Sequence, residues 1–182
     1  MNPAKTREDI LNAAFVEFAA HGYEGASIAE IAKSAGVTKS LVQYHFGAKE
    51  ELWSACIAEH VTPLLDAVDR FLETDQGDPA DLIAARFAFL KQNPQIRRLL
   101  FWAGMGSVPI PAFIEERRDR VLGKLNARPN SPIASRFLAA LAATDGWFLF
   151  RSFYEGPFGG MVFDEATEKR ILEVLMEMVR IP

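Results

Sequence analysis

The sequence predicts an all-α protein, and three observations carry that prediction. Apolar residues recur at spacings of three and four through most of the chain, which is the periodicity of a helix packed on one face. Residues that begin and end helices stand between these segments. No segment has the apolar–polar alternation of a convincing strand. Two domains are expected, a three-helix domain over residues 1–50 and a larger helical domain over 51–182.

The composition indicates a folded protein without a membrane span. The chain has 182 residues, of which 49% are hydrophobic, so it can bury a real core and is not disordered. No run of about 18 apolar residues is present, and the start of the chain lacks the apolar core of a signal peptide. The single cysteine, Cys56, excludes an internal disulfide. We therefore expect a cytoplasmic protein with no membrane partner.

The first two helices are predicted from their capping residues. Thr6 is placed to cap the first helix, which should end where Gly22 supplies a backbone of positive φ. Ser27 should cap a short second helix over 28–34. Glu30 follows that serine by three residues, which is the spacing of a capping box.

The next two helices are predicted in the same way. Gly36 breaks the second helix, and Thr38 should cap a third helix that ends near Phe46. A fourth helix should start near Ala48, and Pro63 is expected to kink it or end it.

The remainder of the chain predicts five further helices. Proline and glycine separate the helical patterns. Ser131 and Pro132 form an N-cap and first-turn pair, and Asp164 is placed to cap the last helix. The expected ranges are 79–92, 94–105, 110–126, 132–154 and 164–180.

Residues 28–47 have the pattern of a helix-turn-helix. Two short helices joined through Gly36 must cross steeply, and the small Ala32 lets them approach closely. Ile31 and Val42 are expected to face inward. Packing uses those apolar positions, so the polar ones define the exposed face of the second helix, which consists of Lys39, Ser40, Gln43 and Tyr44.

That exposed face suits the major groove of DNA, which is about 12 Å wide and admits one helix. Gln43 can pair with adenine, and Lys39 can donate to guanine or to a phosphate. Tyr44 and His45 can reach phosphate oxygens. Lys49 lies at the start of the next helix, and a helix N-terminus binds phosphate readily. The alternative is a solvated helix end, which the glycine turn and the inward apolar positions make the weaker reading.

The charge pattern agrees with this interpretation. The chain has a net charge of −4, which argues against nonspecific binding of nucleic acid by the whole surface. Between Lys33 and Lys49, however, there are three lysines and one histidine but no acid. The segment is therefore a small cationic surface on an acidic protein.

Residues 6–53 resemble the DNA-binding domain of the TetR family of one-component transcription regulators. The resemblance rests on the first helix ending in HGYEGAS, the IAEIAKSAGV helix and turn, and the YHFGAKEEL junction. It implies a recognition helix over 38–44 and a dimer that binds operator DNA. Many members carry a tyrosine where this chain has Gln43, so the contact of Gln43 is either to a base or to a phosphate. The implied DNA-binding residues are Thr38, Lys39, Ser40, Gln43, Tyr44, His45 and Lys49.

The larger domain is rich in aromatic side chains. Most of them are expected to fill a core, but bulky rings between helices also line cavities for apolar ligands. With the family resemblance, this predicts a small apolar or aromatic effector bound by Phe101, Trp102, Met105 and Trp147. Arg98 or Arg151 would favour a carboxylate at one end of such a ligand. The resemblance also implies a homodimer through the helices near 132–154 and 164–180.

The sequence contains no convincing catalytic or metal-binding pattern, and we expect no cofactor. Cys56 and His60 are four residues apart, but two ligands are too few for a metal site. The acids and arginines over 115–120 are expected to form a solvated face with ion pairs. The expected function is that of a ligand-responsive transcription regulator, and a repressor is favoured over an activator. A small all-α enzyme and a protein-binding adaptor are the alternatives.

Overall fold

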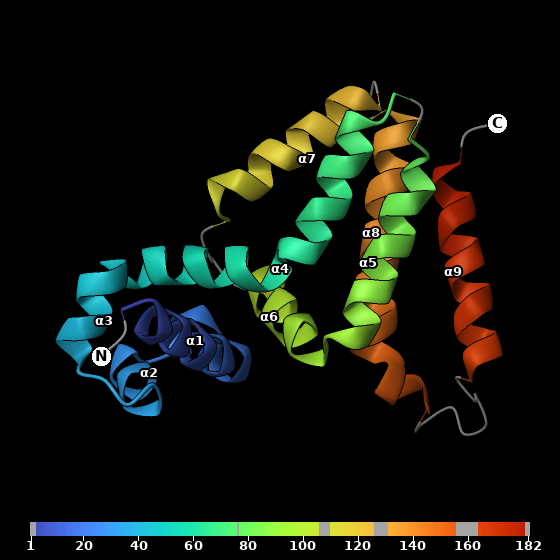
Figure 1. Ribbon diagram of the computed structural model, residues 1–182. Coiled ribbons are helices and arrows are strands. Elements are labelled where there is room, and N and C mark those ends of the chain that lie inside the picture. The colour runs from blue at the N-terminus through green and yellow to red at the C-terminus, as the bar shows by residue number, and fades with distance from the viewer. Residues whose placement is uncertain (1–2, 76, 106–109, 126–130, 156–163, 181–182) are drawn as a thin grey trace. The chain divides into compact units, whose positions relative to one another are not determined.

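The computed structural model describes residues 3–75, 77–105, 110–125, 131–155 and 164–180. Every regular element within these ranges is a helix (Figure 1), as the sequence predicts. The helices are α1 (Pro3–Gly25), α2 (Ile28–Ser34), α3 (Lys39–Phe46), α4 (Lys49–Glu73), α5 (Pro79–Gln92), α6 (Pro94–Met105), α7 (Ala112–Lys124), α8 (Pro132–Glu155) and α9 (Glu165–Val179).

The chain divides into two compact units whose borders lie inside helices. The first unit combines Met1–Thr62 with Arg98–Ala112, and the second combines Pro63–Arg97 with Phe113–Pro182. The first half of α4 and most of α6 therefore belong with the N-terminal helices. These two units are defined by which residues pack together. The boundary predicted at residue 50 was instead placed where the helix-turn-helix motif ends.

The first unit has an aromatic core between α1 and α4. Ile10, Ala14 and Phe18 of α1 are completely buried, because they share the inward face of that helix. Phe18 meets the buried Trp53 of α4 edge-on, with ring centroids 5.0 Å apart. Such pairs contribute about 0.5–1.5 kcal/mol beyond the area they bury.

The end of α1 is fixed by a glycine with an unusual backbone. Gly22 has φ +71°, which interrupts the regular helix as predicted, although one further turn carries α1 to Gly25. The ring of Trp102, from α6, lies against Gly22 within the same unit. A β-carbon at Gly22 would come within 3.0 Å of that ring, so only glycine fits both the backbone and the contact.

Two of the predicted helix starts are wrong. Thr6 is buried inside α1, which already begins at Pro3. Ser27 makes no side-chain cap. The carboxylate of Glu17 in α1 accepts the Ser27 N–H at 3.1 Å, in place of the Glu30 carboxylate that a capping box would use. Of the two effects predicted for Pro63, a kink or an end, the end does not occur, because α4 continues to Glu73. The first of these errors came from local spacing, and the second came from a partner on another helix.

Other predicted boundaries are confirmed. Helices α5 and α6 have the predicted ranges, and α7 is two residues shorter at each end than predicted. Ser131 accepts the Ala134 N–H at 3.2 Å and caps α8. Asp164 accepts the Thr167 N–H at 2.8 Å and caps α9, which lowers the pKa of that carboxyl.

In the second unit, α5, α8 and α9 pack against one another (Figure 1). Their buried apolar residues include Ile83, Ala140 and Leu175. Arg86 of α5 makes a two-pronged ion pair with Asp145 of α8, at 2.9 and 2.8 Å. The last part of α4 is tied to α7 by a similar pair between Asp69 and Arg117, with a shortest distance of 2.8 Å.

Helix α8 is unusually apolar for its exposure. The segment 132–150 is long and apolar enough to span a membrane by length and composition alone, and only 28% of it is buried in the single chain. A single helix of this kind is weak evidence for a membrane span. Contiguous exposed apolar side chains are more typical of a protein interaction surface.

Candidate nucleic-acid interface

Helices α2 and α3 form the predicted helix-turn-helix. The turn between them depends on Gly36, which has φ +66°, and the N–H of Val37 then donates to the carbonyl of Ala32 at 2.9 Å. A β-carbon at Gly36 would meet nothing within 4 Å, so the glycine is needed for its backbone and not for space.

Packing fixes the orientation of α3. Ile31 and Ala32 of α2 and Val42 of α3 are buried, as predicted from the sequence. Because these residues face inward, the opposite face of α3 is presented to solvent. The phrase "exposed face of α3" below means Lys39, Ser40, Gln43 and Tyr44, all of which are exposed.

The start of α3 is held by its own side chains. Thr38 has extended backbone angles and its hydroxyl accepts the Leu41 N–H at 3.3 Å, which confirms the predicted N-cap. The Thr38 and Ser40 hydroxyls also lie 3.0 Å apart. Both side chains are exposed, so they remain accessible to DNA while they stabilise the helix start.

The far half of α3 carries the largest exposed group. Tyr44 is 83% exposed, and such an exposed aromatic side chain contributes nothing to the core. Its ring meets the half-buried His45 edge-on at 5.4 Å. Gln43 beside it is also exposed and has both a donor and an acceptor for a base edge. The exposed face of α3 therefore presents hydrogen-bonding side chains at helical spacing.

Lys49 is placed differently from the other predicted DNA contacts. It begins α4, and its ammonium group donates to the Glu24 carbonyl oxygen at 3.2 Å. It also lies 5.0 Å from the centroid of the Tyr23 ring. Burial, together with nearby Glu50, raises the pKa of Tyr23, so the ring stays neutral at physiological pH. Lys49 is thus directed toward the end of α1.

Arg7, near the start of α1, is not among the residues predicted from the sequence. Its guanidinium lies 5.2 Å from the centroid of Phe46, the last residue of α3. In the sequence, Arg7 is one of several charged residues in the first turns of α1 and nothing local singles it out. Its proximity to α3 depends on how three helices pack, so local spacing does not reveal it.

The predicted effector-binding residues are divided between the two units. Phe101 and Trp102 lie in the first unit, with ring centroids 5.7 Å apart, and both are partly exposed. Trp147 belongs to the second unit and is half-buried, whereas the side chain of Met105 lies outside the described residues. Arg98 is exposed, and Arg151 also lies outside the described side chains.

Cys56 and His60, which the sequence does not predict to bind metal, contact other groups. Cys56 is fully buried, and burial raises its pKa to about 12. The Nδ1 atom of His60 lies 2.9 Å from the Cys56 carbonyl oxygen, and the His60 ring stacks on Phe15 at 3.9 Å. Among the described residues no cluster of three or more potential metal ligands is found.

Comparison with known proteins agrees with this geometry. The family model "Bacterial regulatory proteins, tetR family" matches residues 10–56. The HTH-type transcriptional repressor SCO4008 of Streptomyces coelicolor is 31% identical over 150 residues, which is 81% of this chain and 76% of that protein. The HTH-type transcriptional regulator BetI of Stenotrophomonas maltophilia is 30% identical over 166 residues, 84% of each chain.

A solved structure shows the same fold. The transcriptional regulator SCO4942 of Streptomyces coelicolor superposes with a TM-score of 0.68 over 96% of each chain at 24% identity. Together with the family-model match and the two relatives, the exposed face of α3 and the glycine turn identify a DNA-binding transcription regulator. The chain belongs to the TetR family.

Proposed function

We propose that this regulator is a cytoplasmic repressor that binds a palindromic operator as a homodimer and releases it when a small molecule binds. The observation that carries the proposal is the pairing of one exposed DNA-reading face in the first unit with one unpartnered apolar face in the second. Each protomer would supply one α3 helix to a half-site. Half-sites one helical turn apart, about 34 Å, would place the two helices in successive major grooves.

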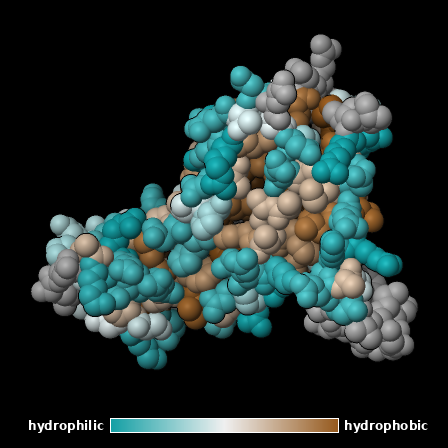
Figure 2. Space-filling model, turned by 45° about the vertical axis from the view of Figure 1, so that its right-hand side comes forward, coloured by the Kyte–Doolittle hydropathy of each residue, from teal (hydrophilic) through white to brown (hydrophobic). Residues whose placement is uncertain are grey.

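The proposed dimer surface is the outer face of α8 and α9. An open groove of about 930 Å³ lies there, lined by Ala139, Val174 and Met178 among other residues. Val174 is 60% exposed, and Leu138 of α8 is 52% exposed. Figure 2 shows hydrophobic surface among the hydrophilic side chains of the second unit. A second copy of α8 and α9 would cover these side chains in a four-helix arrangement.

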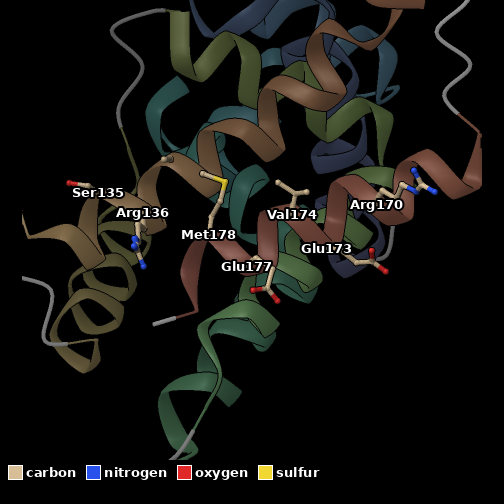
Figure 3. A pocket seen from close by; sticks show the side chains of 8 residues that line it. Ser135, Arg136, Arg170, Glu173, Val174, Glu177 and Met178 are labelled. Atoms are coloured by element: carbon tan, nitrogen blue, oxygen red, sulfur yellow. The ribbon is translucent and has the colours of Figure 1, made fainter. Parts of the chain in front are cut away.

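The charges around this groove suit a two-fold interface. Arg136 and Arg170 lie toward opposite ends of the groove, and Glu177 lies between them (Figure 3). In a two-fold dimer, each surface faces a copy of itself running the other way. A face that carries both signs can therefore pair its arginines with the partner's glutamates.

The proposed effector is an apolar or aromatic molecule that contacts Phe101 and Trp102 in the first unit. Contacts to Met105 and Trp147 stay predictions from the sequence. The contact between Trp102 and Gly22 supports a route to the DNA-binding helices, because a ligand that moved the Trp102 ring would disturb the end of α1. Binding of the ligand and of DNA are then coupled. By thermodynamic reciprocity, operator DNA weakens ligand binding by the same factor.

A gel-shift screen tests the proposal. DNA from beside the protein's own gene should bind far more tightly than random DNA, and an effector should release it while quenching tryptophan fluorescence. The single variants Trp102→Phe and Trp147→Phe, both of which keep Trp53, show which tryptophan is quenched when the ligand binds. Release by highly charged polar metabolites alone would contradict the apolar effector, and absence of a specific complex would contradict the repressor.

A further inference from the structure

The end of α1 receives a tryptophan ring from α6. Within the first unit, the ring of Trp102 lies so close to Gly22 that a β-carbon there would come within 3.0 Å of its Cδ2 atom and 3.1 Å of its Cε3 atom. Gly22 is buried and has φ +71°, so the backbone and the missing side chain together form a notch for the ring. The ring of Phe101 also meets Trp102 edge-on, with centroids 5.7 Å apart. These two contacts fix the position of the Trp102 ring.

The two residues that follow Gly22 hold Lys49, the first residue of α4. The Lys49 ammonium donates to the Glu24 carbonyl oxygen at 3.2 Å and lies 5.0 Å from the centroid of the Tyr23 ring. Tyr23 in turn meets the buried Trp53 edge-on, with ring centroids 5.7 Å apart. We call residues 22–24 the α1-end platform. It contacts Trp102 through its first residue and Lys49 through its other two.

The platform prepares Lys49 for a phosphate. A lysine ammonium has three N–H donors, and the Glu24 carbonyl uses one of them, which leaves two for a phosphate. A lysine side chain loses rotamer freedom when it binds, so one that is already held in place loses less. Lys49 also begins α4, where the helix dipole favours an anion. The phosphate contact expected from the sequence is therefore compatible with the contacts that Lys49 makes in the free chain.

We infer that Trp102 is a positioning residue for DNA binding: its ring, seated in the notch at Gly22, holds the α1-end platform in the conformation that directs Lys49 to a DNA phosphate. The inference rests on the proposed function and adds the means by which α6 controls a DNA contact. Trp102 is 36% exposed, so a small molecule can reach its ring. A molecule that drew the ring out of the notch would weaken DNA binding without contacting α3.

The salt dependence of DNA binding tests this role, because Trp102 carries no charge. Each phosphate contact contributes about 0.9 to the slope of log Kobs against log salt. A residue that only stabilises the fold would leave the slope of the folded protein unchanged. The slope is measured on a fluorescent duplex of about 30 base pairs of random sequence between roughly 50 and 200 mM salt, so that neither operator nor effector is needed. Circular dichroism of each free variant verifies its helix content.

The variants form a double-mutant cycle between Trp102 and Lys49. Trp102→Ala should reduce the slope by about 0.9 for each protomer bound, whereas Trp102→Phe, which keeps a flat ring, should keep the wild-type slope. Lys49→Gln should cause the same reduction as Trp102→Ala. The double variant should show no further reduction, because both changes remove one and the same phosphate contact. Ile110→Ala, which trims another exposed apolar residue of the first unit, should keep the wild-type slope.

Gly22→Ala tests the same contact from the side of α1. Its β-carbon would displace the Trp102 ring, so the slope should again fall by about 0.9 per protomer. This variant keeps Trp102 and replaces Trp102→Ala in the test if Trp102→Ala loses the wild-type helix content.

Three results would overturn the inference. They are a wild-type slope in the folded variant that removes or displaces the Trp102 ring, a wild-type slope in Lys49→Gln, and a further loss of about 0.9 in the double variant, which would mean that Trp102 acts through another contact. Failure of the wild-type protein to bind any duplex is a separate outcome. It would contradict the DNA-binding function itself, and the role of Trp102 would fall with it.

Discussion

The two units of this protein present different exposed surfaces. In the first unit, the exposed face of α3 carries hydrogen-bonding side chains and the 83% exposed Tyr44. In the second unit, α8 and α9 expose aliphatic side chains such as Leu138 and Val174. A polar surface can stay in water until DNA arrives, whereas an apolar surface of this kind favours a permanent partner. The difference is the one expected if the first unit binds DNA reversibly and the second assembles the proposed dimer.

The units also differ in what holds their helices together. The first unit relies on stacked and edge-on aromatic rings around Phe18 and Trp53. The second adds ion pairs between distant parts of the chain, including Arg86 with Asp145 and Lys91 with Glu168. Removal of one partner of such a pair leaves the other charge poorly solvated. Four predictions test these differences, from the largest expected effect to the smallest.

The largest effect is expected from Gln43→Ala combined with Tyr44→Ala. Specific binding typically exceeds nonspecific binding by 10³-fold or more, and loss of the base-reading side chains should remove about that whole margin. Helix content and dimerisation should not change, because both side chains are exposed. Gel shifts with the operator and with random DNA measure the ratio, with Gln92→Ala in α5 as control. An unchanged ratio would mean that α3 does not read the operator.

Val174→Asp should separate the roles of the two units. At a dimer interface the new carboxylate would be buried without a partner, so the dissociation constant of the dimer should rise by about 100-fold or more. The matched control is Val16→Asp in α1, because Val16 is 57% exposed and Val174 is 60% exposed. Sedimentation equilibrium should show monomers for the first variant only. Dimers in both would place the interface elsewhere.

Gly36→Val tests the turn of the helix-turn-helix. Since a side chain at residue 36 has free space, the cost is confined to the positive φ and should be roughly 1–3 kcal/mol of local stability. Gly123 in α7 also has free space and has no positive φ, so Gly123→Val is the control. Hydrogen exchange should show faster opening of α2 and α3 in the first variant. Normal DNA affinity there would mean that the turn tolerates a β-carbon.

The smallest effect concerns pH. The hydrogen bonds from Arg117 lower the pKa of Asp69 below its ordinary 3.8. The pair therefore stabilises the second unit above that pH, and its contribution is lost as the pH falls from 3.8 through the lower folded value. Asp69→Asn should remove this part of the acid dependence, less than about 1 kcal/mol because the pair is partly exposed. Urea titrations at pH 3 and pH 7 measure the change in the free energy of unfolding. An equal change in the wild type and in Asp69→Asn would show that the pair does not stabilise the protein.

The sequence predicted those features of the fold that depend on neighbouring residues. Gly36 at the turn, the Thr38 cap and the inward Val42 follow from local spacing and are confirmed. The capping box of Ser27 with Glu30 failed because Glu17, ten residues earlier and on another helix, accepts the Ser27 N–H that Glu30 was predicted to bind. A local pattern contains no information about such a partner.

The candidate site was predicted to a similar extent. The exposed face of α3 follows from helical periodicity once the inward residues are identified. The inward contacts of Lys49 and the position of Arg7 beside Phe46 depend on how α1 packs against α3 and α4. The ion pairs of the second unit, such as Arg86 with Asp145 across 59 residues, also depend on tertiary packing.

The central claim is that α3 enters the major groove, and cleavage of DNA from a label beside α3 tests it most directly. Ala48→Cys, at an exposed position two residues after α3 that is not among the proposed DNA contacts, can be labelled with an iron–EDTA reagent that cuts nearby DNA. Labelling should be selective because the only native cysteine, Cys56, is buried and has a pKa raised to about 12. We expect two symmetric clusters of cuts in the operator, about 10 base pairs apart or a multiple of that distance. Cleavage no stronger than that from a label placed by Gln92→Cys in α5 would contradict the claim.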